Sequence, residues 1–142
     1  PYIPGLLSFR EIPAILAAWE DLSSRPDLVI CDGHGIAHPR GFGLASHLGL
    51  ALDLPAVGCA KSPLCGRWEE PGADRGDRSR VLDAAGQTIG YCLRTRAGVR
   101  PVWVSVGHMI DLRAAARIVL ACAPLFRLPE PSRAAHRLAG GR

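Results

Sequence analysis

Asp27-Leu-Val-Ile-Cys-Asp32 is a short apolar run between two polar residues, with Pro26 before it and Gly33 after it. A continuous apolar run of this length, bounded by turn-forming residues, is typical of a strand that is buried on both faces in a parallel sheet. The stretch therefore predicts a buried strand that ends at Asp32.

The flanking sequence alternates helical and strand patterns around this run. On the N-terminal side, apolar residues fall on one helical face between Ile12 and Leu22. On the C-terminal side, a glycine-rich loop over 33–41 precedes a predicted helix at 43–52 and a second buried strand at 56–60. Further elements are expected as an irregular stretch at 61–80, a hairpin from 81–83 and 88–94, a strand at 101–106, and helices at 112–121 and 132–138. This order predicts an α/β fold with helices packed on a sheet.

The composition fits one soluble domain, which we expect to span residues 1–142. The 142 residues can bury a core, and no apolar run is long enough to cross a bilayer. Five cysteines without a Cys-x-x-Cys pair favour reduced thiols in a cytoplasmic protein over a disulfide framework or a zinc site. The net charge of +4 permits a phosphate-rich partner without requiring one.

Asp32 and Lys61 each follow a predicted strand. Ligands of open α/β sheets gather at the carboxyl ends of strands, where a carboxylate can hold a divalent cation. Gly33 lets the backbone turn sharply at this point, although Asp32 alternatively only caps a turn. Lys61 can neutralise a phosphate or orient a water molecule there, or it simply begins a solvated loop. If the two strands are neighbours and parallel, both side chains converge on one site.

The other candidate polar residues can be explained by a structural role as well as by a catalytic or binding role. Ser8 and Glu11 match a helix capping box, in which Glu11 only satisfies a backbone amide. Pro13 weakens that reading and suggests that the regular helix starts later than Ser8. In the loop after Asp32, the side chains that can bind a phosphate or shape the loop are His34, His38 and Arg40. Two further histidines, His108 and His136, are candidates that equally suit a turn and a helix surface.

Taken together, the segments resemble the endonuclease V family along almost the whole chain. The matching motifs are PYIPGLLSFRE (1–11), DGHGIAHPR (32–40), VGCAK (57–61) with LCG (64–66), Gly107-His108 and LPEPSR (128–133). The first two motifs are long and ordered, so chance agreement is negligible.

This resemblance implies a ribonuclease H-like mixed sheet flanked by helices. It also implies hydrolysis of DNA or RNA at the second phosphodiester on the 3′ side of inosine, with 3′-hydroxyl and 5′-phosphate products. The expected cofactor is Mg²⁺, with Mn²⁺ as a substitute. The expected partner is inosine-containing nucleic acid. Neither a membrane nor an obligate protein partner is expected, and the protein is expected to be a monomer.

The resemblance also assigns roles to individual residues. It makes Asp32 a direct metal ligand and Glu11 a second catalytic carboxylate, and it matches Lys61 and His136 to active-site positions. The implied wedge, which fills the gap left by a flipped base, is Tyr2, Ile3 and Pro4. The implied base pocket, whose backbone would distinguish the 6-keto edge of hypoxanthine from the 6-amino edge of adenine, comprises Gly5, Leu7, Gly33 and Leu64.

One departure from the family concerns a catalytic aspartate that members carry upstream of the wedge motif. The sequence begins at the wedge, so we expect the chain to lack that aspartate and the opening strands of the sheet, to leave a sheet edge uncovered, and to be inactive alone. The alternatives are another ribonuclease H-like nuclease and a nucleic-acid-binding module without catalysis.

Overall fold

The structure is a computed structural model, and it describes residues 6–140 apart from the side chain of Leu7. Its helices are α1 (Leu7–Glu20), α2 (Leu44–Leu52), α3 (Leu112–Cys122) and α4 (Glu130–Ala139). Its strands are β1 (Val29–Cys31), β2 (Ala56–Ala60), β3 (Arg78–Leu82), β4 (Thr88–Leu93) and β5 (Val102–His108). The predicted wedge residues, together with Gly5 of the predicted pocket, lie outside the described residues.

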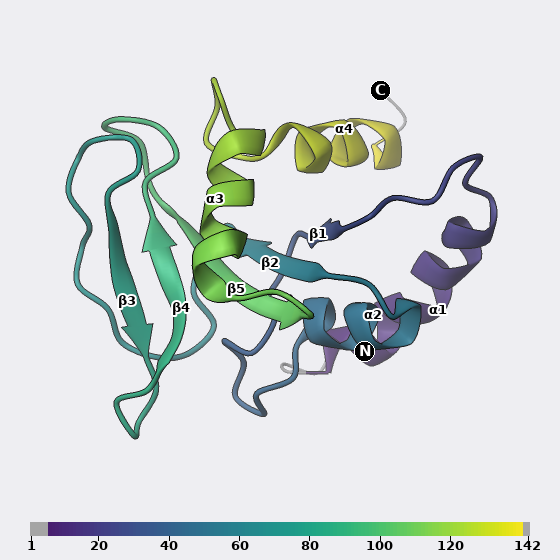
Figure 1. Ribbon diagram of the computed structural model, residues 1–142, viewed down its shortest axis with the longest axis horizontal. Helices are drawn as coiled ribbons and strands as arrows, with labels where there is room; N and C mark the ends of the chain where they lie inside the picture. The colour runs from purple at the N-terminus through teal and green to yellow at the C-terminus, as the bar shows by residue number, and fades with distance from the viewer. Residues whose placement is uncertain (1–5, 141–142) are drawn as a thin grey trace.

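The strands form one mixed sheet in the order β1-β2-β5-β4-β3 (Figure 1). β1 and β2 are parallel, with Cys31 opposite Gly58, while the pairs β2–β5, β5–β4 and β4–β3 are antiparallel. The α/β fold with a mixed sheet flanked by helices is thereby confirmed. The predicted hairpin corresponds to β3 and β4. β1 lies at one edge of the described sheet, next to β2 alone.

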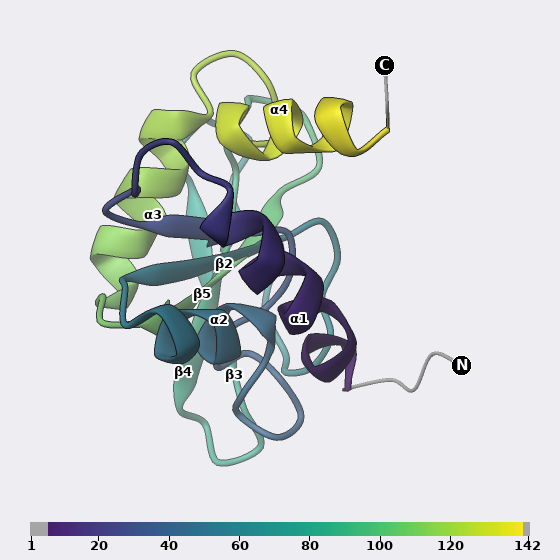
Figure 2. The ribbon, with the colours of Figure 1, turned by 90° about the vertical axis from the view of Figure 1, so that its right-hand side faces the viewer.

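Helices cover both faces of the sheet. Successive strand residues point to opposite sides, so each strand contributes side chains to the packing on both faces. Val57 and Cys59 of β2 face α3 and pack in one cluster with its Ala115 and Val119. The opposite face of β1 packs through Cys31 against α1 and α2. Figure 2 shows α3 and α1 on opposite sides of the sheet. The helices of the described segment are all too short or too polar to cross a bilayer.

The predicted start of the first helix is wrong. α1 begins at Leu7 and continues through Pro13, and the residue before it, Leu6, makes no side-chain cap. Ser8 therefore lies inside the helix, and the capping box with Glu11 does not form. Pro13 is tolerated because it lies on the exposed side of α1, where the carbonyl that it leaves unpaired can reach water. Burial of Ile12 against β1 and α2 offsets the lost hydrogen bond.

Two other boundaries also extend beyond the sequence prediction. β3 begins at Arg78, inside the stretch expected to be irregular. Its first residue, Arg78, already pairs with Leu93, the last residue of β4. α4 begins at Glu130, two residues earlier than expected, with Pro131 in its first turn. Proline is accepted there because the first amides of a helix have no partner within it.

Arginine side chains, together with backbone amides, hold several loops on the sheet. Arg94 is 7% exposed and donates to the carbonyls of Gly72, Pro71 and Val99. Arg75 binds the carbonyls of Leu120, Ala123 and Thr95, and so fastens the end of α3. The planar guanidinium offers five N–H donors, which allows one side chain to bind three carbonyls at once.

Candidate active site

Asp32 and Lys61 meet at the ends of β1 and β2. Lys61 Nζ donates to Asp32 Oδ2 at 2.8 Å, and their side chains are 43% and 54% exposed. The pairing follows from the topology, since adjacent parallel strands deliver their C-terminal residues to the same edge. A carboxylate and an ammonium are thus both accessible to a ligand at the position where α/β sheets bind one.

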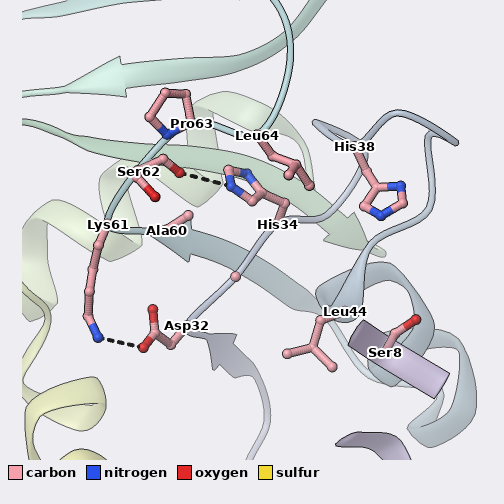
Figure 3. Close-up of a pocket in the computed structure, with 11 residues that line it drawn as sticks. Ser8, Asp32, His34, His38, Leu44, Ala60, Lys61, Ser62, Pro63 and Leu64 are labelled. Atoms are coloured by element: carbon pink, nitrogen blue, oxygen red, sulfur yellow. Dashed lines mark hydrogen bonds and ion pairs between the residues drawn. The ribbon is translucent and has the colours of Figure 1, made fainter. Parts of the chain in front are cut away.

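A cavity of about 280 Å³ opens beside this pair (Figure 3). Four segments line it: the first turn of α1, the loop after β1, the start of α2, and the end of β2 with the loop that follows it. Six candidate residues from the sequence are on its wall, namely Asp32, Gly33, His34, His38, Lys61 and Leu64. The volume is small for a ligand pocket, and it suits one planar base better than a larger molecule.

The loop after β1 reaches the cavity because glycines let it lie directly against the sheet. Gly35 N donates to Ser105 Oγ of β5 at 2.8 Å, and a Cβ at Gly35 would lie 1.8 Å from the carbonyl oxygen of Val106. A Cβ at Gly58 of β2 would lie 2.7 Å from the amide nitrogen of Gly35. Only glycine fits at these two positions, so the approach of the loop depends on them.

The two histidines of this loop have different surroundings. His34 Nε2 lies 3.0 Å from the carbonyl oxygen of Ser62, which ties the loop after β1 to the loop after β2. Burial lowers the pKa of His34, opposed by its hydrogen bond to Ser62 and reinforced by His38. His38 Nδ1 accepts from the amide of Arg40 at 3.0 Å, so it shapes the loop as well as lining the cavity.

Among the described residues, the predicted Glu11, Arg40 and His136 lie outside the cavity wall. Glu11 is partly buried on α1, one turn beyond Ser8, which does line the cavity. Its neighbour Ile12 packs against Cys31, so this part of α1 lies close to the end of β1. His136 is exposed on α4, a helix that contacts β1, and Arg40 is exposed on its loop.

The donors at this edge fit a hard, hydrated cation better than zinc. No group of three or more His, Cys, Asp or Glu side chains that could hold a metal occurs within residues 6–140. Structural and catalytic zinc sites take three or four protein ligands, whereas magnesium uses one or two carboxylates with water and substrate phosphate. Asp32 is exposed enough to hold such an ion, and Glu11 is a further carboxylate on the neighbouring helix α1.

Sequence reasoning missed several residues at this site. Ser8 and Leu44 line the cavity, although the sequence pattern suggests only a helix cap for Ser8. Arg127 Nη2 donates to the carbonyl of Lys61, which lies 66 residues away along the chain. No spacing rule connects such distant positions. The position of Arg127 directly before the LPEPSR motif was the only signal.

Comparison with known proteins gives a consistent result. The sequence model of the family described as Endonuclease V matches residues 1–137. A curated Endonuclease V from Roseiflexus sp. is 56% identical over 139 residues, covering 98% of this chain and 62% of the relative. Another from Trichormus variabilis is 54% identical and covers the whole chain and 64% of the relative. The chain thus spans about three fifths of the length of these relatives.

Solved structures agree with the sequence comparison. The crystal structure of Endonuclease V from Streptomyces avermitilis superposes with a TM-score of 0.93 at 52% identity, over 97% of this chain and 60% of that one. Endonuclease V from Ciona intestinalis was solved with a 23mer DNA containing an inosine followed by a ribo-adenosine. It superposes with a TM-score of 0.84 at 28% identity, over 97% of this chain and 65% of that one. The fold, the motifs and these relatives together show that this chain belongs to the endonuclease V family.

Proposed function

We propose that the protein is a metal-dependent endonuclease that hydrolyses a phosphodiester of DNA or RNA next to inosine, in the repair of deaminated adenine. The observation that carries the proposal is the accessible Asp32–Lys61 pair at the mouth of a cavity sized for one base. An enzyme that recognises a base and cuts a nearby phosphate needs a base pocket next to its catalytic groups. Here the cavity lies beside the sheet edge that carries Asp32 and Lys61. The inosine-containing DNA bound by the Ciona intestinalis relative supports this choice of substrate.

The cavity supports recognition of a flipped base. Gly33 leaves its backbone open to the cavity, and Leu64, which is 42% exposed, offers an apolar wall. We assign Gly5 and Leu7 to the same pocket. The wedge Tyr2-Ile3-Pro4 would take the place of the base in the duplex, since an aromatic ring and a proline replace lost stacking. Backbone amides would then select the 6-keto edge of hypoxanthine.

Mg²⁺, or Mn²⁺ in its place, would supply charge neutralisation at the scissile phosphate and a water of lowered pKa. Asp32 would bind the ion directly, and Glu11 would hold the ion or its water. Lys61 would offset the charge that grows on the phosphate oxygens, and His136 would act on the leaving group or the water. His38 and Arg40 hold the neighbouring backbone phosphate.

The proposed reaction is hydrolysis at the second phosphodiester on the 3′ side of the lesion. Water adds to phosphorus, the bond between phosphorus and the 3′ oxygen breaks, and the 3′ oxygen takes a proton. The products are a 3′-hydroxyl end and a 5′-phosphate end. We propose that the enzyme acts as a monomer in the cytoplasm, where its buried, unpaired thiols suit a reducing environment.

The test compares cleavage of matched oligonucleotides with inosine or adenine at one position, in Mg²⁺ and after chelation. Cutting of the inosine strand alone, at the second phosphodiester and only with the metal present, is the expected result. Equal cutting of both strands would favour a nuclease without base selectivity. Tight inosine binding without cutting at any metal concentration would favour a module that only binds.

A further inference from the structure

The loop after β2 is held by side chains from two distant segments. Its consecutive carbonyls, at Lys61 and Ser62, each accept a hydrogen bond from a basic residue. Arg127 Nη2 donates to the Lys61 carbonyl at 2.5 Å, and His34 Nε2 lies 3.0 Å from the Ser62 carbonyl. The backbone on the C-terminal side of the Lys61 Cα is therefore fixed from two sides.

Arg127 joins this loop to the start of β5. Its Nη2 also donates to the carbonyl of Pro101 at 2.9 Å, and its Nε donates to the carbonyl of Arg100 at 2.9 Å. The last backbone pair between β2 and β5 is Ala60 with Trp103, so the guanidinium continues the connection beyond the end of the ladder. A planar fork is needed to reach these carbonyls together.

His34 joins the same loop to the loop that carries Asp32. A carbonyl oxygen can only accept, so Nε2 of His34 carries the proton and donates it. His34 follows Asp32 by two residues, and Ser62 directly follows Lys61 (Figure 3). This hydrogen bond therefore sets the spacing of the two loops beside the Asp32–Lys61 pair.

The ion pair alone is too weak to fix this arrangement. Both side chains are about half exposed, and an exposed pair of this kind contributes little against the entropy of a flexible lysine. The geometry must come from the backbone that carries Lys61. We propose that His34 and Arg127 are positioning residues that hold the Lys61 ammonium against Asp32, a role in cleavage that rests on the proposed function.

The inference can be tested without any assay of cleavage, because Lys61 is the only lysine among the 142 residues. Lysine labelled with ¹³C at Cε gives one NMR signal from this chain. In the wild type, Asp32→Asn breaks the pair and should shift that signal. In Arg127→Gln, the signal should already lie near the unpaired position, and adding Asp32→Asn should shift it little further.

Three further variants separate positioning from general stability. Arg94→Gln removes a buried arginine that binds carbonyls of other loops, so it should destabilise the fold. In this variant, adding Asp32→Asn should still shift the Lys61 NMR signal as far as it does in the wild type. His34→Leu should reduce that response. His34→Gln should restore it, because its amide nitrogen lies as many bonds from Cβ as the histidine Nε2 and can donate to the same carbonyl.

In cleavage assays, Arg127→Gln and His34→Leu should lower kcat by about 10- to 100-fold with little change in KM, since displacement of a catalytic group acts on the chemical step. A folded Arg127→Gln whose Lys61 signal matches wild type and still shifts fully with Asp32→Asn would overturn the proposal. If Arg127→Gln does not fold, the same criterion applies to His34→Leu. A third outcome would separate the two proposals. If the Lys61 signal behaves as expected in the variants but the wild type does not cleave beside inosine, the positioning role stands and only the proposed function is refuted.

Discussion

The Lys61 ammonium donates to the Asp32 carboxylate at 2.8 Å, although the two residues come from strands separated by an entire helix. The contact exists because β1 and β2 are adjacent and parallel, so both strands end at one edge. The pair is exposed enough to meet a substrate. This relationship between the two strand ends is the basis of the first prediction.

In the full-length protein, Asp32→Asn should abolish cleavage, by at least about 1,000-fold, and largely preserve binding to an inosine-containing oligonucleotide. The variant removes the charge that holds the metal but leaves the base cavity intact. Because the pair is exposed, stability should change by less than about 1 kcal/mol. Single-turnover cleavage and fluorescence anisotropy measure the two effects. Asp53→Asn, at an exposed left-handed position after α2, is the matched control and should retain full activity.

Gly58→Ala should destabilise the protein by about 3 kcal/mol or more, because a methyl group would meet the backbone of the loop after β1 at 2.7 Å and 2.8 Å. Neither strand nor loop can yield without moving Asp32. Thermal unfolding measures the loss. Gly98→Asn is the control, since its left-handed position is open and asparagine accepts that conformation. Equal melting temperatures for Gly58→Ala and wild type would show that the loop does not pack as described.

Arg94→Lys should cost about 3 kcal/mol despite preserving the charge. The buried guanidinium binds three carbonyls, and a lysine ammonium cannot reach all of them, so some are left buried and unpaired. Glu70 also pairs with Arg94, but its side chain is 69% exposed, so Glu70→Gln should cost less than about 1 kcal/mol. Urea unfolding of the two variants compares them directly. A larger effect at Glu70 would show that the ion pair, and not the carbonyls, fixes Arg94.

Alkaline pH should weaken the fold through buried thiols. Burial first, and then the charge of Glu70, raises the pKa of Cys92 to about 11 from its ordinary value near 9. The unfolded thiol ionises from pH 9 upward while the folded one stays protonated, so stability is lost as pH rises from 9 to 11. Between pH 9 and 10, wild type should lose about 1 kcal/mol more than Cys92→Ala in urea unfolding. Parallel pH curves for the two proteins would contradict this.

Local patterns predicted the elements that frame the site. An apolar run ending in Asp32 and a second run ending before Lys61 were sufficient to predict two strands and their shared edge. Strand order was not available from such patterns. β5 lies between β2 and β4. Its pairing with β2 involves packing of residues that are far apart in the sequence, such as Gly35 in the loop after β1 against Val106 of β5.

The sequence failed where the structure depends on long-range contacts or on the context of one residue. Pro13 predicts a later start of the first helix, but α1 runs through it. Pro13 lies on the exposed side of α1, where the carbonyl left without an N–H donor can bind water. Arg127 belongs to no spacing pattern, because its partners at Lys61 and Pro101 come from two other segments. Such contacts become visible only when the sheet has brought the segments together.

The arginines that the structure describes differ in their tolerance of mutation. At exposed positions such as Arg96 and Arg117, only a positive charge is presented, and lysine should be an acceptable exchange. At Arg75, Arg94 and Arg127, each side chain binds several carbonyls from separate segments, which an ammonium cannot do. Exchange to lysine should therefore have little effect at exposed positions such as Arg96 and Arg117 and be harmful at these three positions, even though none of the three is proposed to touch the substrate.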